Sequence, residues 1–552
     1  MIEGNRSKTS ARASVTRSSV SRRDVLRIGG AIIPAGILLP AWMSARAQQA
    51  PPSTFDYYIS PSGSDSNPGT LAAPWAITSA SNLSFTSQNV ANNAAMAGKR
   101  VGFLPGTYDV SAMMPSTIGG ALFPPAGSAS ANTYWASSDS NGNYSLRTAT
   151  LNAKGSNGLY GGHAGGPGNE PAIIGHLPES GPQGYIVIDG LVFTGFSYRA
   201  IRIGGVSYGG PELITNPVVI QNCELTGGGH NSGDGLDNAA AIWIDGTRAC
   251  TIHNCYIHDN APWTAGDQGH TNAIIAWQCS GSIIQYNTVV NSGNVYGKVE
   301  GNQGNIIQYN YIDASMYTSE AGGIGDWTGA PSSNLTMTTI FRNNIILMAS
   351  GVAIGWPTLS NSYGFSTPLL VYNNTIVSQG SGPVVAWVTD SDAGTVQFYN
   401  NIYTGGSGGS FNNWGNFMVN PSAPGIWDYN LVPTSGVTWT LYSNSNFGSS
   451  IASYSSASAF ASGLASNGGI SNAEAHSISG TPTFTNSGTL AQLYQLAAGS
   501  PGKGAGSTSG TPSGQPTDMG AWGNGATQIG ANLSGSAVAQ PAVPMAPVLT
   551  VS

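Results

Sequence analysis

Charge is scarce in this chain. Only 8% of its 552 residues are Asp, Glu, Lys or Arg, against about 25% in an average globular protein. Glycine is abundant instead, with 76 residues, and Ser, Thr and Asn are frequent. This composition disfavours helices and predicts strands joined by turns.

Cysteine is also rare. The chain has only Cys223, Cys250, Cys255 and Cys279, and none of them forms a CxxC pair. The spacing therefore argues against a zinc site. We expect Cys223 and Cys255 to be buried free thiols rather than a disulfide.

Long apolar runs are almost absent, and the clearest one stands near the start. Ile28 to Trp42 is apolar and about 15 residues long, which is short for a membrane span. Ser21-Arg22-Arg23-Asp24-Val25-Leu26 precedes it and resembles a twin-arginine export motif, while Ala45-Arg46-Ala47 follows as a cleavage site. We interpret residues 1–47 as a signal peptide, which predicts a periplasmic or extracellular protein.

Removal of that segment makes the protein strongly acidic. Residues 1–47 contain eight Lys/Arg and two acids, so the mature chain has 10 basic and 23 acidic residues and a net charge of −13. Such a surface repels nucleic acid and anionic membranes. It also repels an anionic polysaccharide unless a cation intervenes. We expect a monomer without nucleic-acid or membrane partners.

A short pattern recurs along the chain at intervals of 23 to 34 residues. Its fourth position holds Cys or Asn in most copies. The copies are Ile220-Gln-Asn-Cys-Glu-Leu, Ile252-His-Asn-Cys-Tyr-Ile, Ile284-Gln-Tyr-Asn-Thr-Val, Ile307-Gln-Tyr-Asn-Tyr-Ile, Phe341-Arg-Asn-Asn-Ile-Ile, Val371-Tyr-Asn-Asn-Thr-Ile, Phe398-Tyr-Asn-Asn-Ile-Tyr and, more weakly, Asp428-Tyr-Asn-Leu-Val.

Stacked coils explain this repeat. Equivalent residues in stacked strands lie about 4.8 Å apart, a spacing at which Asn side chains can hydrogen-bond amide to amide. The flanking Ile and Val would then point inward and fill the core. We predict an all-β, right-handed parallel β-helix solenoid with an Asn ladder through Asn287, Asn310, Asn344, Asn374 and Asn401, closed by N- and C-terminal caps.

The repeats resemble the right-handed parallel β-helix superfamily that contains the pectate lyases. Tyr57 to Thr70 and Leu104-Pro105-Gly106-Thr107-Tyr108 are similar to the opening of secreted members, and Ser500-Pro501 with Asp518 to Ala521 to their closing segment. The predicted parts of the chain are a signal peptide (1–47), an N-terminal cap with early coils (48–165), the β-helix core (166–432), late coils with a C-terminal closure (433–530) and a disordered tail (531–552).

The strand before each ladder position carries the candidate site. We align Ile203, Ile244, Ala276 and Val299 as inward neighbours. The outward columns are then Arg202, Trp243, Ile275 and Lys298, and Gly204, Asp245, Trp277 and Glu300. Trp327 and Trp356 follow on later coils. Exposed indoles beside charged groups suit sugar rings, although loops could instead cover them and the charges could form ordinary ion pairs.

Loop lengths support the same location. The coil of Lys298 is the shortest, and the coils before and after it carry long loops that bring His270, Tyr317, Asp267 and Glu320. We predict Lys298, Glu300, Asp245 and Arg202 as catalytic residues. Trp243, Trp277, Trp327, Trp356, His270 and Tyr317 are predicted to bind substrate, and Asp267, Asp326 and Glu320 to bind a metal. We interpret His253 and His258 as turn or surface residues.

Two reactions compete at such a site. In a polysaccharide lyase, Lys298 or Arg202 removes the proton α to a uronate carboxylate, and carboxylates bind Ca²⁺, which takes several oxygen ligands. In an inverting glycoside hydrolase on a neutral glycan, Asp245 and Glu300 form a carboxylate pair about 6.5–9.5 Å apart. A non-catalytic glycan-binding or surface solenoid is the third possibility. The lyase is our leading hypothesis.

Overall fold

The computed structural model describes most of the chain between residues 49 and 531. The described ranges are 49–81, 87–114, 119–154, 171–176, 184–196, 199–204, 214–228, 239–260, 271–277, 279–292, 295–298, 304–314, 324–327, 339–348, 352–356, 369–378, 384–388, 397–405, 411–418, 426–434, 437–442, 450–468, 474–507, 518–523 and 526–531. The predicted signal peptide lies outside these ranges. No helix within them is long and apolar enough to cross a membrane.

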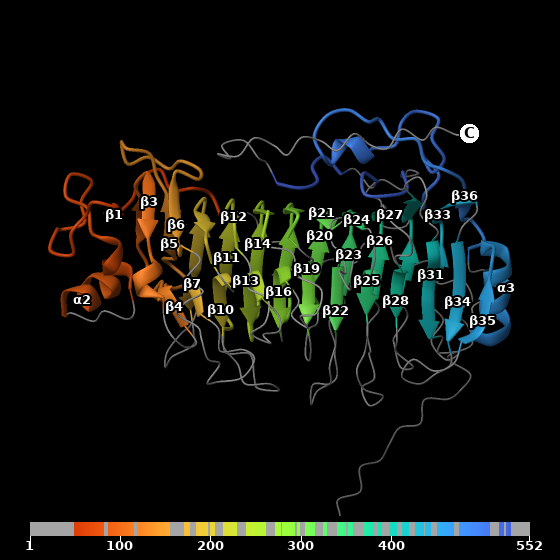
Figure 1. Cartoon of the computed structure of the whole chain (residues 1–552), viewed down its shortest axis with the longest axis horizontal. Coiled ribbons are helices and arrows are strands. Elements are labelled where there is room, and N and C mark those ends of the chain that lie inside the picture. Colours follow the sequence, from red (N-terminus) through yellow and green to blue (C-terminus); the bar gives the residue numbers. More distant parts are fainter. Residues whose placement is uncertain are drawn as a thin grey trace, which may run out of the picture.

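Three twelve-stranded sheets run the length of the molecule (Figure 1). Sheet 1 consists of β1 (Tyr57–Ile59), β2 (Arg100–Phe103), β5 (Thr133–Ser137), β8 (Ile186–Asp189), β11 (Val218–Gln221), β14 (Cys250–His253), β17 (Ile283–Gln285), β20 (Ile306–Gln308), β23 (Thr339–Arg342), β26 (Leu369–Tyr372), β29 (Gln397–Tyr399) and β32 (Ile426–Asp428).

Sheet 2 consists of β4 (Gly119–Leu122), β7 (Pro171–His176), β10 (Arg199–Gly204), β13 (Ala239–Asp245), β16 (Thr271–Trp277), β19 (Val295–Lys298), β22 (Ile324–Trp327), β25 (Val352–Trp356), β28 (Val384–Val388), β31 (Phe411–Met418), β34 (Val437–Tyr442) and β35 (Ser450–Tyr454). Its strands pair in parallel except β34 and β35, which are antiparallel.

Sheet 3 consists of β3 (Gly106–Asp109), β6 (Ala149–Asn152), β9 (Val192–Thr194), β12 (Glu224–Thr226), β15 (Tyr256–His258), β18 (Thr288–Val290), β21 (Tyr311–Ala314), β24 (Ile345–Met348), β27 (Thr375–Ser378), β30 (Ile402–Gly405), β33 (Leu431–Val432) and β36 (Ile478–Ser479). Each central coil passes from sheet 2 to sheet 1 to sheet 3. The fold is therefore a right-handed parallel β-helix, as predicted.

Helices lie at the two ends of the solenoid (Figure 1). Near the N-terminal end are α2 (Ser87–Ala95) and the short 3-10 helices η1 (Ile77–Ala80) and η2 (Ser111–Met113), and α3 (Ala457–Gly468) packs against β35 and β34 at the other end. A third 3-10 helix, η4 (Gln492–Tyr494), belongs to the C-terminal segment. A solenoid end is an open sheet edge, and such elements shield it from pairing with other chains.

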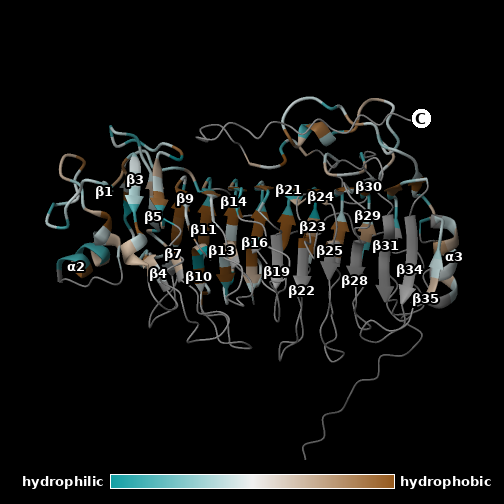
Figure 2. Cartoon of the chain, viewed as in Figure 1, coloured by the Kyte–Doolittle hydropathy of each residue, from teal (hydrophilic) through white to brown (hydrophobic). Residues whose placement is uncertain are grey.

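The core follows from alternation along each strand. Inward Ile, Val and Phe residues of successive coils form one continuous buried cluster from Ile59 to Phe460, and many of the described strands in the middle of the solenoid are coloured as hydrophobic in Figure 2. Each coil therefore buries its apolar side chains together with those of the neighbouring coils.

The turn from sheet 1 to sheet 3 contains the repeated motif. Its first turn residue has a positive φ, as in Asn343 (54°) and Asn373 (54°), and the following residue is the ladder position. Hydrogen bonds of 3.0 to 3.2 Å join the side-chain amides from Asn287 through Asn430. Each Asn Oδ1 from Asn310 to Asn430 also accepts the backbone N–H of the preceding Asn. These buried amides are thus well satisfied, which is what makes polar side chains acceptable in a core.

Cys223 and Cys255 occupy the ladder position in two earlier coils. All four cysteines are free and buried, which confirms the prediction for this pair. Burial raises the pKa of the Cys223 thiol, and the neighbouring Cys255 adds to the rise. Both residues therefore act as small apolar side chains in the column.

The C-terminal segment turns back over the outer face of sheet 3 (Figure 1). The amide of Asn373 donates to the carbonyl oxygens of Asp518 and Gly520, and that of Asn343 to Ala521 and Gly523. The apolar contacts beneath it form one cluster, which includes Tyr311, Ile345, Leu347, Val377, Leu490, Ala521 and Ile529. The closing segment therefore covers the side of several coils as well as an end.

Candidate functional site

The candidate site lies on the outer face of sheet 2. The register places Arg202 beside Trp243, and Trp243 beside Ile275. It also places Asp245 between Gly204 and Trp277. These neighbours are the predicted ones, because inward Ile and outward polar residues alternate along these strands.

The alternation is interrupted once, just before this stretch. Ala241 and Ile242 both belong to the core, whereas Ala240 and Trp243 share an outer cluster. In the neighbouring strand, Ala200 and Ile201 are both in the core in the same way. Ala240 and Trp243, which are three residues apart, therefore both lie on the outer face, whereas regular alternation would place outer residues two apart.

A buried ion pair organises the face. Nη2 of Arg202 donates to Oδ2 of Asp245 at 2.9 Å, and the indole Nε1 of Trp243 donates to the same oxygen at 3.1 Å. The side chains of Arg202 and Asp245 are only 3% and 4% exposed. Burial raises the pKa of the Asp245 carboxyl, and Arg202 offsets part of that rise.

Two indoles stack along the solenoid axis above this pair. The ring centroids of Trp243 and Trp277 are 5.5 Å apart, with planes 24° from parallel. Trp243 is buried, whereas Trp277 is partly exposed. Arg199 lies over the Trp243 ring, with its guanidinium carbon 3.9 Å from the ring centroid. Arg199 was not among the predicted site residues, because a two-residue alternation does not place it on this face.

The predicted register is wrong at the next coil. Lys298 pairs with Trp277 on one side and with Trp327 on the other. It does not pair with Ile275, whose neighbour is Tyr296. The position two coils from Asp245 is thus Lys298 and not Glu300, and Gly297 takes the inward place predicted for Val299. A shift of two residues leaves every side chain on the same face, so the apolar pattern could not detect it.

The remaining predicted residues are placed only in part. The structure gives the backbone register of Lys298, Asp326, Trp327 and Trp356, in β19, β22 and β25. Glu300, Asp267, His270, Tyr317 and Glu320 lie outside the described residues. Within the part of the chain that is described, no group of three or more His, Cys, Asp or Glu is arranged to hold a metal ion.

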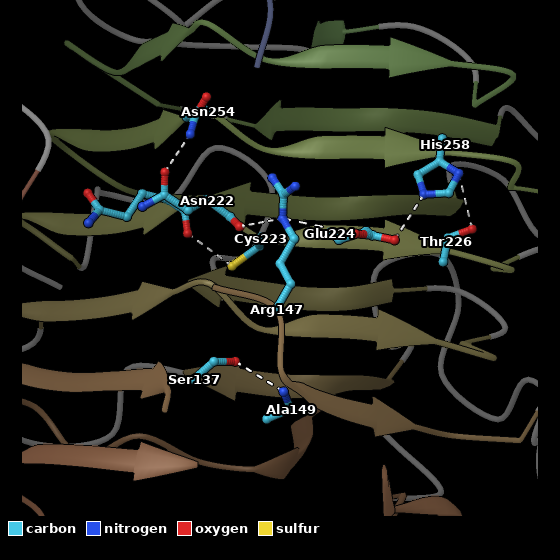
Figure 3. Close-up of polar contacts among 10 residues, drawn as sticks. Ser137, Arg147, Ala149, Asn222, Cys223, Glu224, Thr226, Asn254 and His258 are labelled. Carbon is cyan, nitrogen blue, oxygen red and sulfur yellow. Dashed lines mark hydrogen bonds and ion pairs between the residues drawn. The ribbon is translucent and has the colours of Figure 1, made fainter. Parts of the chain in front are cut away.

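A second polar cluster lies on the outer face of sheet 3. Figure 3 shows its residues Arg147, Glu224 and His258, and Asp259 is the fourth member. Nε2 of His258 is 3.4 Å from Oε1 of Glu224, and Nδ1 is 2.8 Å from Oδ2 of Asp259. Nε of Arg147 lies 4.0 Å from Glu224 and donates to a backbone carbonyl oxygen.

His258 is buried in this cluster, and His253 is buried on sheet 1. The interpretation of both as turn or surface residues is therefore wrong. Their short motif cannot show that neighbouring coils and segments enclose them. The cluster of Figure 3 belongs to sheet 3, so it is separate from the tryptophan stack on sheet 2.

Comparison with known proteins gives similarities of architecture. No family model matches the chain, and no curated protein matches it. A solved rhamnogalacturonan lyase is similar with a TM-score of 0.39 and 14% identity over 63% of this chain and 82% of that one. Pectate lyase Pel9A is similar with a TM-score of 0.39 and 14% sequence identity, over 86% of this chain and 96% of that one. The GH136 lacto-N-biosidase from Eubacterium ramulus is similar with a TM-score of 0.31 and 10% sequence identity, over 71% of this chain and 65% of that one. The parallel sheets themselves define the chain as a right-handed parallel β-helix protein.

Proposed function

We propose that this protein is an exported carbohydrate-active enzyme, and specifically a polysaccharide lyase that cleaves a uronate-containing glycan by β-elimination. One observation carries the proposal: Lys298 aligns between Trp277 and Trp327 in a single column of sheet 2. Neighbouring coils lie about 4.8 Å apart, so the two tryptophan positions are about 10 Å apart with the lysine between them.

The chemistry assigned to this column needs a base and a sugar platform. Lys298, as the neutral amine, takes the proton α to the uronate carboxylate, the β C–O bond breaks to leave a C=C bond in the sugar, and the departing sugar oxygen takes up a proton from water. A lysine can serve as the base where desolvation or nearby cations lower its pKa. Trp277, which is partly exposed, offers an indole against which a sugar ring can stack.

Arg202 and Asp245 suit a supporting role better than a catalytic one. Their side chains are buried and bound to each other, so proton transfer by either would break an ion pair inside the protein. Arginine also remains protonated in proteins. We therefore propose Lys298 over Arg202 as the base, with the ion pair holding the indole of Trp243 in place.

The corrected register weakens the hydrolase alternative. Glu300 follows the end of β19 and is not the aligned partner two coils from Asp245. The strand register therefore does not support the expected separation between the Asp245 and Glu300 carboxylates, and the lyase is the better proposal. The non-catalytic solenoid remains the outcome if no glycan is cleaved.

Calcium and export complete the proposal. An acidic protein that acts on an acidic glycan needs a cation between them, and Asp267, Asp326 and Glu320 are the oxygen donors proposed for Ca²⁺. Export through the twin-arginine motif would place a monomeric enzyme in the periplasm or outside the cell, where its polysaccharide partner is found.

The deciding experiment is a glycan panel. The mature protein is incubated with uronate-containing and neutral polysaccharides, with calcium and with a chelator. A lyase releases a product that absorbs near about 232 nm, because elimination conjugates C=C to a carboxylate. Reducing ends without that band would identify a hydrolase. The absence of both products, with retained glycan binding, would identify a binding protein.

A further inference from the structure

We propose that Arg199 is a positioning residue, which fixes the orientation of Trp277 through the buried ring of Trp243. The inference rests on the proposed function, because it takes Trp277 as the sugar platform. Arg199 itself is buried and does not take part in the chemistry.

The geometry is a column of three stacked side chains in three successive coils. Arg199 is in β10, Trp243 in β13 and Trp277 in β16, and these strands are neighbours in that order. The Arg199 guanidinium lies 3.9 Å from the Trp243 centroid, and the Trp277 ring lies 5.5 Å away on the side of the next coil. Both faces of the Trp243 ring are therefore in contact.

The edge of Trp243 is fixed as well. Its Nε1 donates to Asp245, whose Oδ2 also accepts from Arg202. The ring thus cannot slide or flip without breaking a buried hydrogen bond or a stacking contact. Its tilt is transmitted to Trp277, whose plane lies 24° from that of Trp243. A guanidinium over a desolvated indole is attracted to the face of the ring, and this attraction opposes tilting of the indole.

The identity of the cation matters in this arrangement. A guanidinium is planar and stacks face to face on an indole, whereas an ammonium is a compact point charge on a flexible stem. Substitution by lysine should therefore keep the charge and lose much of the orientation. Substitution by methionine keeps most of the volume and removes both charge and planarity, so it separates loss of stacking from creation of a cavity.

The first test is spectroscopic and needs no substrate. The signal of the indole pair is the part of the near-ultraviolet circular dichroism that needs both rings. It is lost in W243F and equally in W277F, and the double variant shows no further loss of it. We expect Arg199→Met to reduce this signal strongly and Arg199→Lys to reduce it in part. The matched control is Arg248→Met, at an exposed arginine, which should leave the pair signal intact. An unchanged pair signal in Arg199→Met, with the fold retained by far-ultraviolet spectra, would overturn the proposal.

The second test uses turnover on any substrate found with the glycan panel. We expect Arg199→Met to raise KM roughly tenfold with kcat changed by less than about twofold, since it disturbs a platform and not the base. A fall in kcat at constant KM contradicts the positioning role. If no glycan is cleaved, the proposed function fails while the spectroscopic test still decides whether Arg199 orients Trp277.

Discussion

Trp277 stacks on Trp243 at 5.5 Å between ring centroids, and of these two neighbouring indoles only Trp277 is partly exposed. The buried indole is tied to the Arg202–Asp245 ion pair through Asp245. The buried ion pair with Trp243 and the proposed sugar platform Trp277 therefore lie next to each other on the outer face of sheet 2. The ion pair has a structural role, and the proposed chemistry is assigned to Lys298 in the coil after Trp277.

Replacement of Lys298 by alanine should abolish formation of unsaturated product, because it removes the proposed base. Trp277→Ala should mainly raise KM, since it removes a stacking surface and no proton carrier. Initial rates of absorbance near about 232 nm measure both effects. Release of reducing ends is measured in parallel, and its loss in D245N and E300Q with full release in K298A would instead support the hydrolase.

Removal of either member of the Arg202–Asp245 pair should destabilise the fold by about 3–5 kcal/mol, because it leaves a buried charge without its partner. The side chains are 3% and 4% exposed, so water cannot replace the lost contact. Chemical denaturation of R202M, D245N and the double variant measures the effect. We expect the double variant to be more stable than the sum of the single changes predicts, and simple additivity would show that the two side chains are not coupled.

His253 should make stability depend on pH in mildly acidic solution. Burial lowers the pKa of this imidazole to about 4 from an ordinary value of 6.5. The unfolded chain therefore binds a proton that the folded chain resists, and stability falls by on the order of 3 kcal/mol as pH decreases from 6.5 to 4. His253→Gln is the matched variant, because Gln221 and Gln285 hold the aligned positions in the adjacent coils. Equal pH profiles for the two proteins would contradict this assignment.

The paired asparagines should differ in their contribution to stability. Asn373 has a positive φ and binds the C-terminal segment, while Asn374 lies in the buried ladder. Asn373→Gly keeps the turn conformation and should cost about 1 kcal/mol, and Asn374→Ala should cost about 3 kcal/mol because it leaves buried partners unsatisfied. Urea unfolding measures both values. If the Asn373 side chain anchors the segment, Asn373→Gly should raise hydrogen exchange mainly where the segment covers sheet 3, whereas Asn374→Ala should raise it throughout the surrounding coils.

The cysteines should all alkylate without a reductant once the protein is unfolded. Cys223 and Cys255 are adjacent ladder residues with free, buried thiols. Intact mass after alkylation in denaturant counts the thiols. A mass that lacks two labels and two hydrogens, assigned to this pair, would show a disulfide.

Sequence alone was sufficient for the architecture and for part of the site. The repeat from Ile220 to Asn430 predicts stacked coils because each coil must bury its apolar residues against the next one. It also gives the pairing of Arg202 with Trp243 and of Asp245 with Trp277, since one strand follows the other after a full coil. These predictions depend only on alternation along a strand and on regular spacing between coils.

Tertiary structure decided the rest. A period of two residues cannot reveal a shift of two, so only the strand pairing places Lys298, and not Glu300, beside Trp277. The break in alternation at Ala200 and Ile201 leaves Arg199 on the outer face, where it lies over Trp243, and no alternating pattern would predict that contact. Burial of Arg202 and Asp245 depends on packing by residues far apart in the chain. The order of residues in one strand therefore determined which face each side chain occupies, whereas the contacts between coils determined which side chains are partners.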